Sequence, residues 1–331
     1  MIHNLEKLIK NFSKTKILVI GDLALDKYTI GESNRISPEA PVPIIAITSE
    51  RYVPGCAANT AHNMSSFKAK VYVVGIIGKD TEGDKLMSLM RDYDIECSGI
   101  SQMDDVKTIM KERIISKSSG QPQQIARMDY EEPIREQRDR IYDTIAEYVK
   151  KVDLIIVSDY NKGLIDKKIA TYLIDVAGKN NVRIIVDTKP ENAILFEGVY
   201  LMKPNLTEAK KMSGIENIND SNIRDVGEIL RAKYKTNIII TRGSKGMALF
   251  EEGKYTLIPS QALEVSDVSG AGDTVIASIA MCLASGADLE TSARIANCAA
   301  EIVVEKFGTA VTDSEELIGR IKNMKTDRAY K

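Results

Sequence analysis

Short apolar runs alternate with amphipathic stretches along most of the chain. The runs are typical of buried strands: KILVIGD (16–22), VYVVGIIG (71–78), DLIIVSDY (153–160), VRIIVD (182–187), YLMKPN (200–205) and NIIITRG (237–243). Segments between them, such as 80–93, 137–151 and 222–235, have the spacing of amphipathic helices. Strands that alternate with helices predict an α/β fold, with a mostly parallel central sheet and helices on both faces.

Two segments interrupt this alternation. Residues from about 27 to 53 and from about 106 to 130 have strand patterns without helices, and the second contains a turn at SSGQP (118–122). Together they predict a small accessory sheet inserted into a single domain that covers 1–331. Such a sheet either forms a lid over an active site or simply extends the edge of the main sheet.

Composition excludes several classes of protein. The chain has 331 residues, is 44% hydrophobic and 28% charged, and carries a net charge of −2, so no electrostatic argument favours a nucleic-acid or membrane partner. The four cysteines show no metal-binding spacing, and scattered free cysteines suit a reducing cytoplasm. The N-terminal residues do not form a secretion signal, and no apolar run approaches the length of a membrane span. We therefore expect a cytoplasmic protein.

The stretch SDVSGAGDTV (266–275) carries the clearest chemical signal. Glycines ahead of a helix let backbone N–H groups approach an anion, and the helix N-terminus favours negative charge. Asp273 would then accept a proton from a substrate hydroxyl while those N–H groups stabilise a phosphate. The alternative is structural, with Asp273 acting only as the cap of a core helix.

Four motifs in order resemble the ribokinase-like (PfkB) sugar kinases, over nearly the whole chain. They are PGCAANTAHN (54–63) with GIIGKDTEG (75–83), KPNLTEAK (203–210), TRGSKG (241–246) and DVSGAGDT (267–274). GDLALDKY (21–28), NRISPEAPVPII (34–45) and SDYNKG (158–163) further resemble the D-glycero-β-D-manno-heptose 7-phosphate kinases of ADP-heptose and lipopolysaccharide synthesis. Those kinases often form the first half of a bifunctional protein. Because no nucleotidyltransferase half follows Lys331, we expect a stand-alone kinase.

The resemblance implies a set of catalytic and nucleotide-binding residues. Asp273 would be the base, and Gly270, Ala271 and Gly272 would form the anion hole for the transferred phosphate. Asn205 and Glu208 would organise Mg²⁺ and phosphates through water, although the same pair fits a helical capping box. The nucleotide would contact Thr241, Gly243, Gly246 and Asn297, and K⁺ or another monovalent cation would bind at Asp267 and Ser269. Each of these features also has a structural explanation. TRGSKG is typical of a turn, a helical asparagine such as Asn297 is often a surface or packing residue, and an aspartate such as Asp267 often bonds backbone N–H groups.

On the sugar side, the resemblance assigns hydroxyl contacts to Asp26, Gly55 and Asn59. Further candidates in the heptose-kinase segments are Arg35, Lys162, Arg127 and Asp129, because a sugar phosphate needs cationic partners. Each cation, taken singly, is also typical of a solvated surface. Ser158 and Asp159 end a strand at the carboxyl edge of the sheet, where open α/β sheets bind ligands.

Two departures from the family pattern lie in the segments assigned to sugar binding. The signature has Cys56 where relatives have a second glycine, so its side chain could narrow the sugar pocket. The hairpin around 118–122 is also longer than usual.

The resemblance therefore implies transfer of phosphate from ATP, with Mg²⁺, to the anomeric hydroxyl of the heptose 7-phosphate, and the sequence contains no P-loop motif. We also expect a homodimer that buries the lid edge. Alternatives are a ribokinase-like kinase for fructose 6-phosphate, ribose or a nucleoside, and a non-catalytic sugar-nucleotide sensor.

Overall fold

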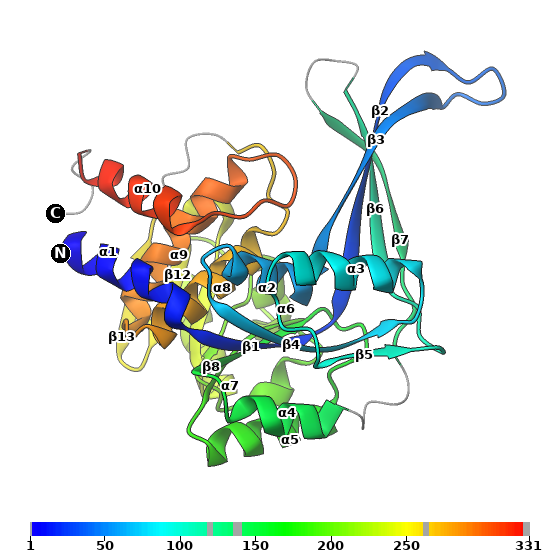
Figure 1. The fold of residues 1–331 in the computed structure, drawn as a ribbon. Helices are drawn as coiled ribbons and strands as arrows, with labels where there is room; N and C mark the ends of the chain where they lie inside the picture. Colours follow the sequence, from blue (N-terminus) through cyan, green and yellow to red (C-terminus); the bar gives the residue numbers. More distant parts are fainter. Residues whose placement is uncertain (1, 118–121, 135–140, 261–264, 327–331) are drawn as a thin grey trace.

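In a computed structural model, residues 2–117, 122–134, 141–260 and 265–326 are described. Their largest element is a nine-stranded sheet in the order β13-β12-β11-β10-β9-β8-β1-β4-β5 (Figure 1). Pairing is parallel from β5 to β11, whereas β12 and β13 add antiparallel strands at one edge. The strands are β1 (Lys16–Gly21), β4 (Lys70–Gly78), β5 (Ile100–Met103), β8 (Leu154–Asp159), β9 (Arg183–Thr188), β10 (Leu201–Met202), β11 (Asn237–Thr241), β12 (Met247–Glu251) and β13 (Lys254–Ile258).

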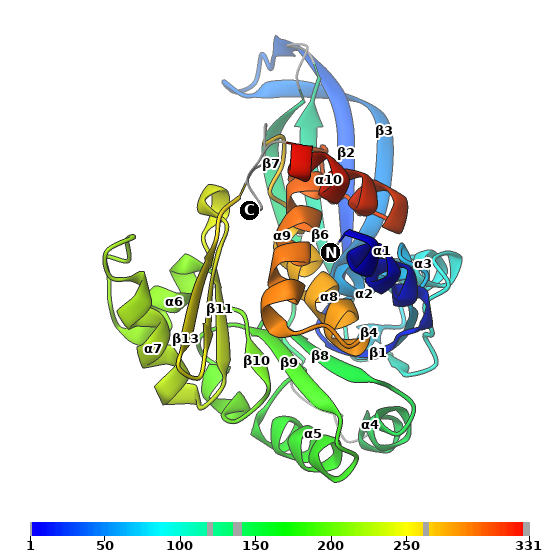
Figure 2. The same ribbon diagram turned by 90° about the vertical axis from the view of Figure 1, so that its left-hand side faces the viewer.

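Helices cover both faces of this sheet (Figure 2). One layer contains α1 (Ile2–Lys10), α2 (Ala57–Ser65), α3 (Thr81–Asp92), α8 (Ala271–Ala284), α9 (Leu289–Val304) and α10 (Ser314–Thr326). The other contains α4 (Tyr142–Val149), α5 (Lys167–Lys179), α6 (Leu206–Ser213) and α7 (Ile223–Tyr234). Short 3₁₀ turns lie at Asn11–Lys14, Ala193–Phe196 and Gly243–Lys245.

Side-chain alternation in the strands explains the two hydrophobic cores. In β1, Ile17 and Val19 pack into the core beneath α2 and α8, whereas Leu18 and Ile20 pack into the core beneath α4 and α5. Successive side chains of a strand point to opposite faces, so a continuous apolar run belongs to a sheet covered on both sides. The predicted three-layer α/β fold is confirmed.

A second, four-stranded sheet projects from the large one in the order β3-β2-β6-β7 (Figure 1). Its strands are β2 (Leu23–Ile36), β3 (Pro43–Cys56), β6 (Ile109–Ser116) and β7 (Gln123–Tyr130). The outer pairs are antiparallel and β2–β6 is parallel. We call this sheet the lid. Strands β2 and β3 extend past both ends of the predicted segment 27–53. The second hairpin is predicted to be longer than usual, but its residues 118–121 lie outside the described residues.

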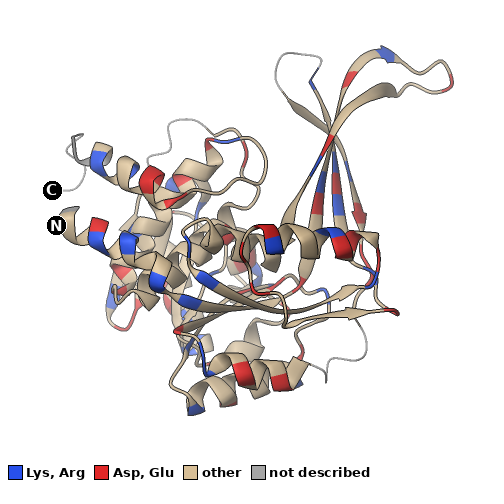
Figure 3. Cartoon of the chain, viewed as in Figure 1, with Lys and Arg blue, Asp and Glu red and all other residues tan. Residues whose placement is uncertain are grey.

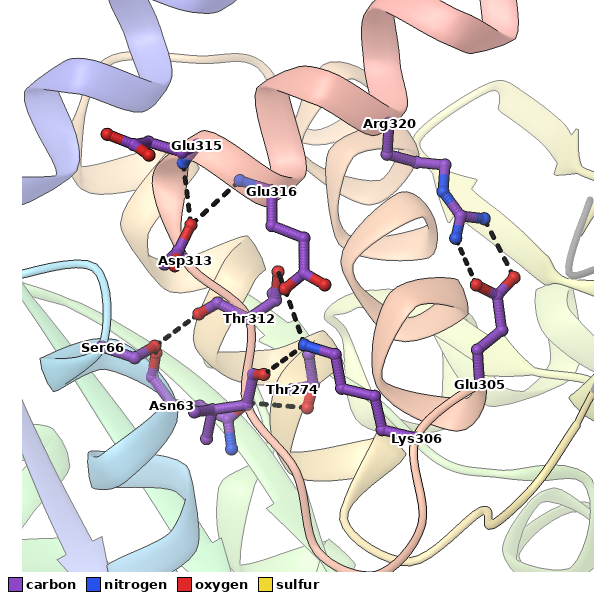
Figure 4. Close-up of polar contacts among 11 residues, drawn as sticks. Asn63, Ser66, Thr274, Glu305, Lys306, Thr312, Asp313, Glu315, Glu316 and Arg320 are labelled. Atoms are coloured by element: carbon purple, nitrogen blue, oxygen red, sulfur yellow. Dashed lines mark hydrogen bonds and ion pairs between the residues drawn. The ribbon is translucent and has the colours of Figure 1, made fainter.

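The layer that contains α2 and α8 is held together by polar contacts (Figure 4). Thr274 donates its hydroxyl to Asn63 over 2.7 Å, joining α8 to α2. Ser66 donates to the carbonyl of Thr312 over 2.6 Å, which joins α2 to the segment before α10. These contacts fix the start of α8 against the lid-bearing part of the fold. Of the helices in the described ranges, none has the length and hydropathy needed to cross a membrane.

Candidate active site

The start of helix α8 lies beside helix α2. Gly270 is the N-cap and adopts a φ of 80°, in the left-handed region that glycine tolerates. A Cβ at this position would lie 2.9 Å from the side-chain nitrogen of Asn59. Conformation and close approach therefore both favour glycine here, and the first N–H groups of α8 are left without a side-chain cap.

Asp273 is buried in the first turn of α8, and its carboxylate accepts hydrogen bonds from three side chains. Asn59 donates over 2.7 Å, Tyr160 over 2.8 Å and Thr60 over 3.1 Å. The N-cap of α8 is Gly270 and the Asp273 carboxylate bonds side chains of other elements, so the prediction that Asp273 could serve as the helix cap was wrong. The donors come from α2 and from the loop after β8, far away in the sequence.

Electrostatics at this point are dominated by burial. Burial raises the pKa of Asp273, while the donors Asn59 and Tyr160 and the charge of Lys203 oppose that shift. Asp187, at the end of β9, forms a 2.8 Å ion pair with the buried Lys203. Burial raises the pKa of Asp187 to about 6 despite that lysine.

A cavity of about 510 Å³ lies along the carboxyl edge of the parallel strands. Gly272 lies on its wall, and a Cβ there would be 3.5 Å from Nζ of Lys203. Three carboxylates and three cations also line it, from Asp159, Asp187, Glu208, Lys189, Lys203 and Arg242. This concentration of charge suits a polyanion with a cation.

Sequence reasoning missed four residues of this region: Tyr160, Asp187, Lys189 and Lys203. Tyr160 and Lys203 stand inside motifs that were recognised, SDYNKG and KPNLTEAK. Asp187 closes a predicted strand, so the rule that ligands bind at the carboxyl ends of parallel strands could have found it.

Asn205 and Glu208 form a complete capping box at the start of α6. Glu208 also contacts Lys189 over 2.7 Å and lines the large cavity. Glu208 therefore caps the helix and lines the cavity at the same time.

The donor set of this cavity fits Mg²⁺. The described residues contain no cluster of three or more His, Cys, Asp or Glu side chains that would form an all-protein cage. Mg²⁺ keeps several waters and usually needs only one or two carboxylates beside substrate phosphates. Glu208 and Asp187 supply carboxylates of that kind on one cavity wall.

A second cavity, of about 310 Å³, shares Thr241, Gly243, Val268 and Gly272 with the first. Its other walls are mainly apolar, from Met247, Val265, Val275, Ala300 and Val304. Gly246 has a φ of 79°, and a Cβ there would meet the carbonyl oxygen of Ile258 at 2.1 Å. The pair of cavities suits a ligand with a flat apolar part and a charged part.

Asn297 lines the second cavity, and its amide donates to the carbonyl of Pro259 over 3.0 Å and to Glu301 over 2.8 Å. It therefore packs the helix as well as facing the cavity. Asp267 accepts from the backbone N–H groups of Ser269 (2.8 Å) and Gly308 (3.1 Å). That pairing is the structural alternative considered for Asp267.

At the base of the lid, Asp26 forms an ion pair with Arg113 over 3.1 Å. Its Oδ1 atom is buried and has no hydrogen-bond partner among the residues described. A Cβ on Gly55 would lie 2.7 Å from that oxygen, so glycine keeps space free beside it. A buried acceptor without a partner is costly unless a ligand donates to it.

Cys56 adopts a φ of 53°, in the left-handed region. Its sulfur lies 3.4 Å from the ammonium of Lys111, and burial raises the pKa of the thiol to about 12. A neutral thiol therefore stands where the family pattern has glycine.

The remaining sugar-side candidates are distributed unevenly. Asp129 binds Arg127 through two 2.8 Å hydrogen bonds, and Lys162 is paired with Glu131. The register of the lid places Arg127 opposite Arg113 and Asp129 opposite Lys111, so all four side chains share one face with Asp26. Charged residues of both signs mark these strands (Figure 3).

Arg35 is different, because it pairs with Ile44 near the far end of the lid hairpin and is exposed. Nine residues of strand separate it from Asp26, which is roughly 30 Å.

Ser158 and Asp159, at the end of β8, stabilise the loop that follows this strand. Asp159 accepts from the backbone N–H of Asn161 over 2.9 Å, and the carbonyl of Ser158 accepts from the N–H of Asp22.

Comparison with known proteins gives a consistent result. The profile described as pfkB family carbohydrate kinase matches residues 14–316. Among curated proteins, the chain is 37% identical over 317 residues to the Bifunctional protein HldE of Sulfurimonas denitrificans. It is 38% identical over 306 residues to the protein of that name from Helicobacter pylori J99. These matches cover 94% and 91% of this chain and 65% of each relative, so the chain spans slightly less than two thirds of their length.

Solved structures share the fold at low identity. Phosphofructokinase-2 of Escherichia coli in complex with potassium superimposes with a TM-score of 0.77 at 18% identity, over 94% of this chain and 99% of that one. Ribokinase of Arabidopsis thaliana, complexed with ribose and ATP, gives 0.70 at 20% identity, over 93% and 99%.

Proposed function

The chain belongs to the pfkB family of carbohydrate kinases, and on that premise we propose that it phosphorylates the anomeric hydroxyl of D-glycero-β-D-manno-heptose 7-phosphate. ATP is the donor, and the product is the 1,7-bisphosphate used in ADP-heptose synthesis. The observation that carries the kinase chemistry is the position of Gly272. It lines both cavities and directly precedes the buried carboxylate of Asp273.

The two joined cavities support a site for ATP. The smaller, mainly apolar cavity takes the adenosine part against Thr241, Gly243, Gly246 and Asn297. The larger, charged cavity takes the phosphates, and the N–H groups at Gly270, Ala271 and Gly272 receive the transferred one. Glu208 would hold Mg²⁺ there through water, and the bound metal would neutralise phosphate charge.

Asp273 acts as the general base. It takes the proton of the anomeric hydroxyl as the oxygen attacks the γ-phosphorus, and ADP leaves in line on the other side. Lys203 lies beside Gly272 and so reaches the same phosphate, where its ammonium stabilises the charge that develops. Asp187 holds that ammonium in place.

The sugar lies between Asp273 and the base of the lid. Oδ1 of Asp26 and the amide of Asn59 receive its hydroxyls, with Gly55 leaving room for the ring. The fixed phosphate is bound by cations on the lid face and the adjoining loop. Arg127 lies opposite Arg113 in the lid, with Asp129 orienting it, and Lys162 pairs with Glu131, whose charge also acts on Lys111. Arg127 and Lys162 therefore join Lys111 and Arg113 at this phosphate. Arg35 lies too far along the hairpin to do so within one chain.

Two lid copies pair in a homodimer. Large apolar side chains are exposed along the lid, namely Ile36, Val42, Ile47, Ile125, Met128 and Tyr130. Exposed sheet edges with apolar residues favour association. A dimer would also let Arg35 reach the sugar site of the second subunit.

K⁺ binding at Asp267 and Ser269 belongs to the same proposal, since the carboxylate oxygens of Asp267 each accept only one bond in the described residues.

The experiment is a coupled assay of ADP release with heptose 7-phosphate, free heptose, fructose 6-phosphate, ribose and a nucleoside as acceptors. The heptose phosphate should give the highest kcat/KM. A higher value for another sugar would assign the protein to a different member of the family. Absence of ADP release with every acceptor would favour a sugar-nucleotide sensor.

A further inference from the structure

Tyr160 connects the candidate base to both ligand regions. Its hydroxyl donates to Oδ1 of Asp273 over 2.8 Å. The ammoniums of Lys111 and Lys189 each lie 5.3 Å from the centre of its ring, one from the lid and one from the phosphate cavity. Its backbone N–H is held by the buried carboxylate of Asp22 over 2.9 Å. The side chain is therefore fixed from several directions.

The hydrogen bonds of Asp273 are divided unequally between its two oxygens. Oδ1 accepts from Tyr160 and from Thr60, which occupies both of its lone pairs. Among the residues that the structure describes, Oδ2 accepts from Asn59 alone, over 2.7 Å. One lone pair on Oδ2 is thus available for the proton of a substrate hydroxyl.

We propose that Tyr160 is a positioning residue that saturates Oδ1 of Asp273, keeps this buried carboxylate ionised and leaves Oδ2 as the atom that accepts the substrate proton. The tyrosine hydroxyl donates throughout and transfers no proton itself. The inference rests on the proposed role of Asp273 as the base. It adds the atom that acts and the residue that selects it.

The surroundings make such a donor necessary. Asp273 is buried, and burial disfavours its charged form. Among the described residues, the charged and titratable groups that face it are Asp187 on β9, Lys203 between β10 and α6, Asp26 on β2, Cys56 on β3 and Tyr160 after β8. Lys203 favours the carboxylate, whereas Asp26 and Asp187 oppose it. Neutral donors such as Tyr160 stabilise the charge without adding a competing anion.

The test measures the pKa of Asp273 directly in the enzyme without sugar. Protein labelled with ¹³C at the aspartate carboxyls is titrated by NMR, and the Asp273 signal is identified by its loss in Asp273→Asn. In Tyr160→Phe the pKa of Asp273 should rise by about one pH unit, because one hydrogen bond to the anion is lost. The matched control is Tyr148→Phe in α4, which removes a tyrosine hydroxyl that forms a 2.6 Å hydrogen bond with Ser98. It should leave the Asp273 titration unchanged.

A second variant keeps the ring and changes only the strength of the donor. Incorporation of 3,5-difluorotyrosine at position 160 makes the hydroxyl more acidic, so the pKa of Asp273 should fall. Opposite shifts in the two variants support the positioning role. If both leave the titration of Asp273 within about 0.3 pH units of wild type, the proposal is wrong, whichever sugar the enzyme uses.

Activity assays then separate this inference from the proposed function. With the best acceptor from the sugar panel, the acidic limb of the kcat/KM profile should move to higher pH in Tyr160→Phe. An equal loss at every pH, with the limb unmoved, would reduce Tyr160 to a packing residue. A different preferred sugar would overturn the heptose assignment and leave the titration result intact.

Discussion

The side-chain amide of Asn59 donates to the carboxylate of Asp273 over 2.7 Å, across 214 positions of sequence. This bond joins the N-terminal motif, on α2, to the glycine-rich turn at the start of α8. It puts a residue assigned to the sugar and a residue assigned to proton transfer in direct contact. Both ends of the chain thus contribute to one site, which the alternation of strands and helices places at the carboxyl edge of the sheet.

Asp273→Asn removes the base and keeps the shape of the side chain. We expect kcat to fall at least about a hundredfold, since general-base catalysis contributes roughly 10²–10⁴. ATP affinity, measured by calorimetry, should be nearly unchanged because the nucleotide cavities remain intact. Turnover near that of wild type would mean that Asp273 only organises Asn59, Thr60 and Tyr160.

Glu208→Gln should increase the Mg²⁺ concentration needed for half-maximal rate and lower kcat. The amide oxygen can still accept from the N–H of Asn205 and preserve the capping box, whereas the charge that anchors the hydrated metal is lost. The melting temperature shows whether the cap survives. An unchanged Mg²⁺ requirement with a lower melting temperature would leave Glu208 as a capping residue only.

Lys203→Met should lower kcat by about a hundredfold, because one preorganised charge at the transferred phosphate is removed. The change also leaves Asp187 buried without its partner, so part of the loss could come from instability. The double variant Asp187→Asn/Lys203→Met separates the effects. If Lys203 acts on phosphate, the double variant recovers thermal stability but not turnover. Recovery of both would make the pair structural.

Lys162→Gln and Arg127→Gln should reduce the preference for a phosphorylated sugar. A charged hydrogen bond to phosphate is expected to be worth about tenfold or more in kcat/KM, while the unphosphorylated sugar should be little affected. Asp26→Asn should instead weaken the binding of the phosphorylated and the unphosphorylated sugar alike, because both carry the hydroxyls that Asp26 contacts. Lys107→Gln is the control, since this exposed lysine pairs with Glu132. Equal losses for both sugars in Lys162→Gln would exclude a phosphate contact.

Ile47→Glu should convert a lid dimer into a monomer. Ile47 is 62% exposed on β3, an edge strand of the lid, and a charge there would be buried in the dimer contact. Light scattering at micromolar concentration measures the mass. Ile194→Glu is the matched control, because Ile194 is 53% exposed and lies outside the lid. A wild-type monomer at that concentration would reject the dimer but not the kinase.

Much of the fold follows from local patterns in the sequence. After the exposed Lys16, the run ILVIG in β1 is apolar and buried at every position because both faces of the sheet are covered, and that burial is visible as a continuous hydrophobic run. Gly270 and Asp273 could also be singled out, since glycines ahead of a helix let backbone N–H groups approach an anion. The family motifs singled out in the same way Glu208, Thr241, Gly243 and Gly246, which line the two cavities.

Other features depended on the tertiary structure. The donors Thr60 and Tyr160 on Asp273, the Lys203–Asp187 pair and the Arg113–Asp26 pair join residues from different elements. Local periodicity records which face of an element is buried, but it does not record which side chains of distant elements meet. Arg35 shows the converse: it stands in a recognised motif, yet the length of its strand carries it away from the site. The order of strands and the length of the lid hairpin, which arise only when the whole chain packs, decide both outcomes.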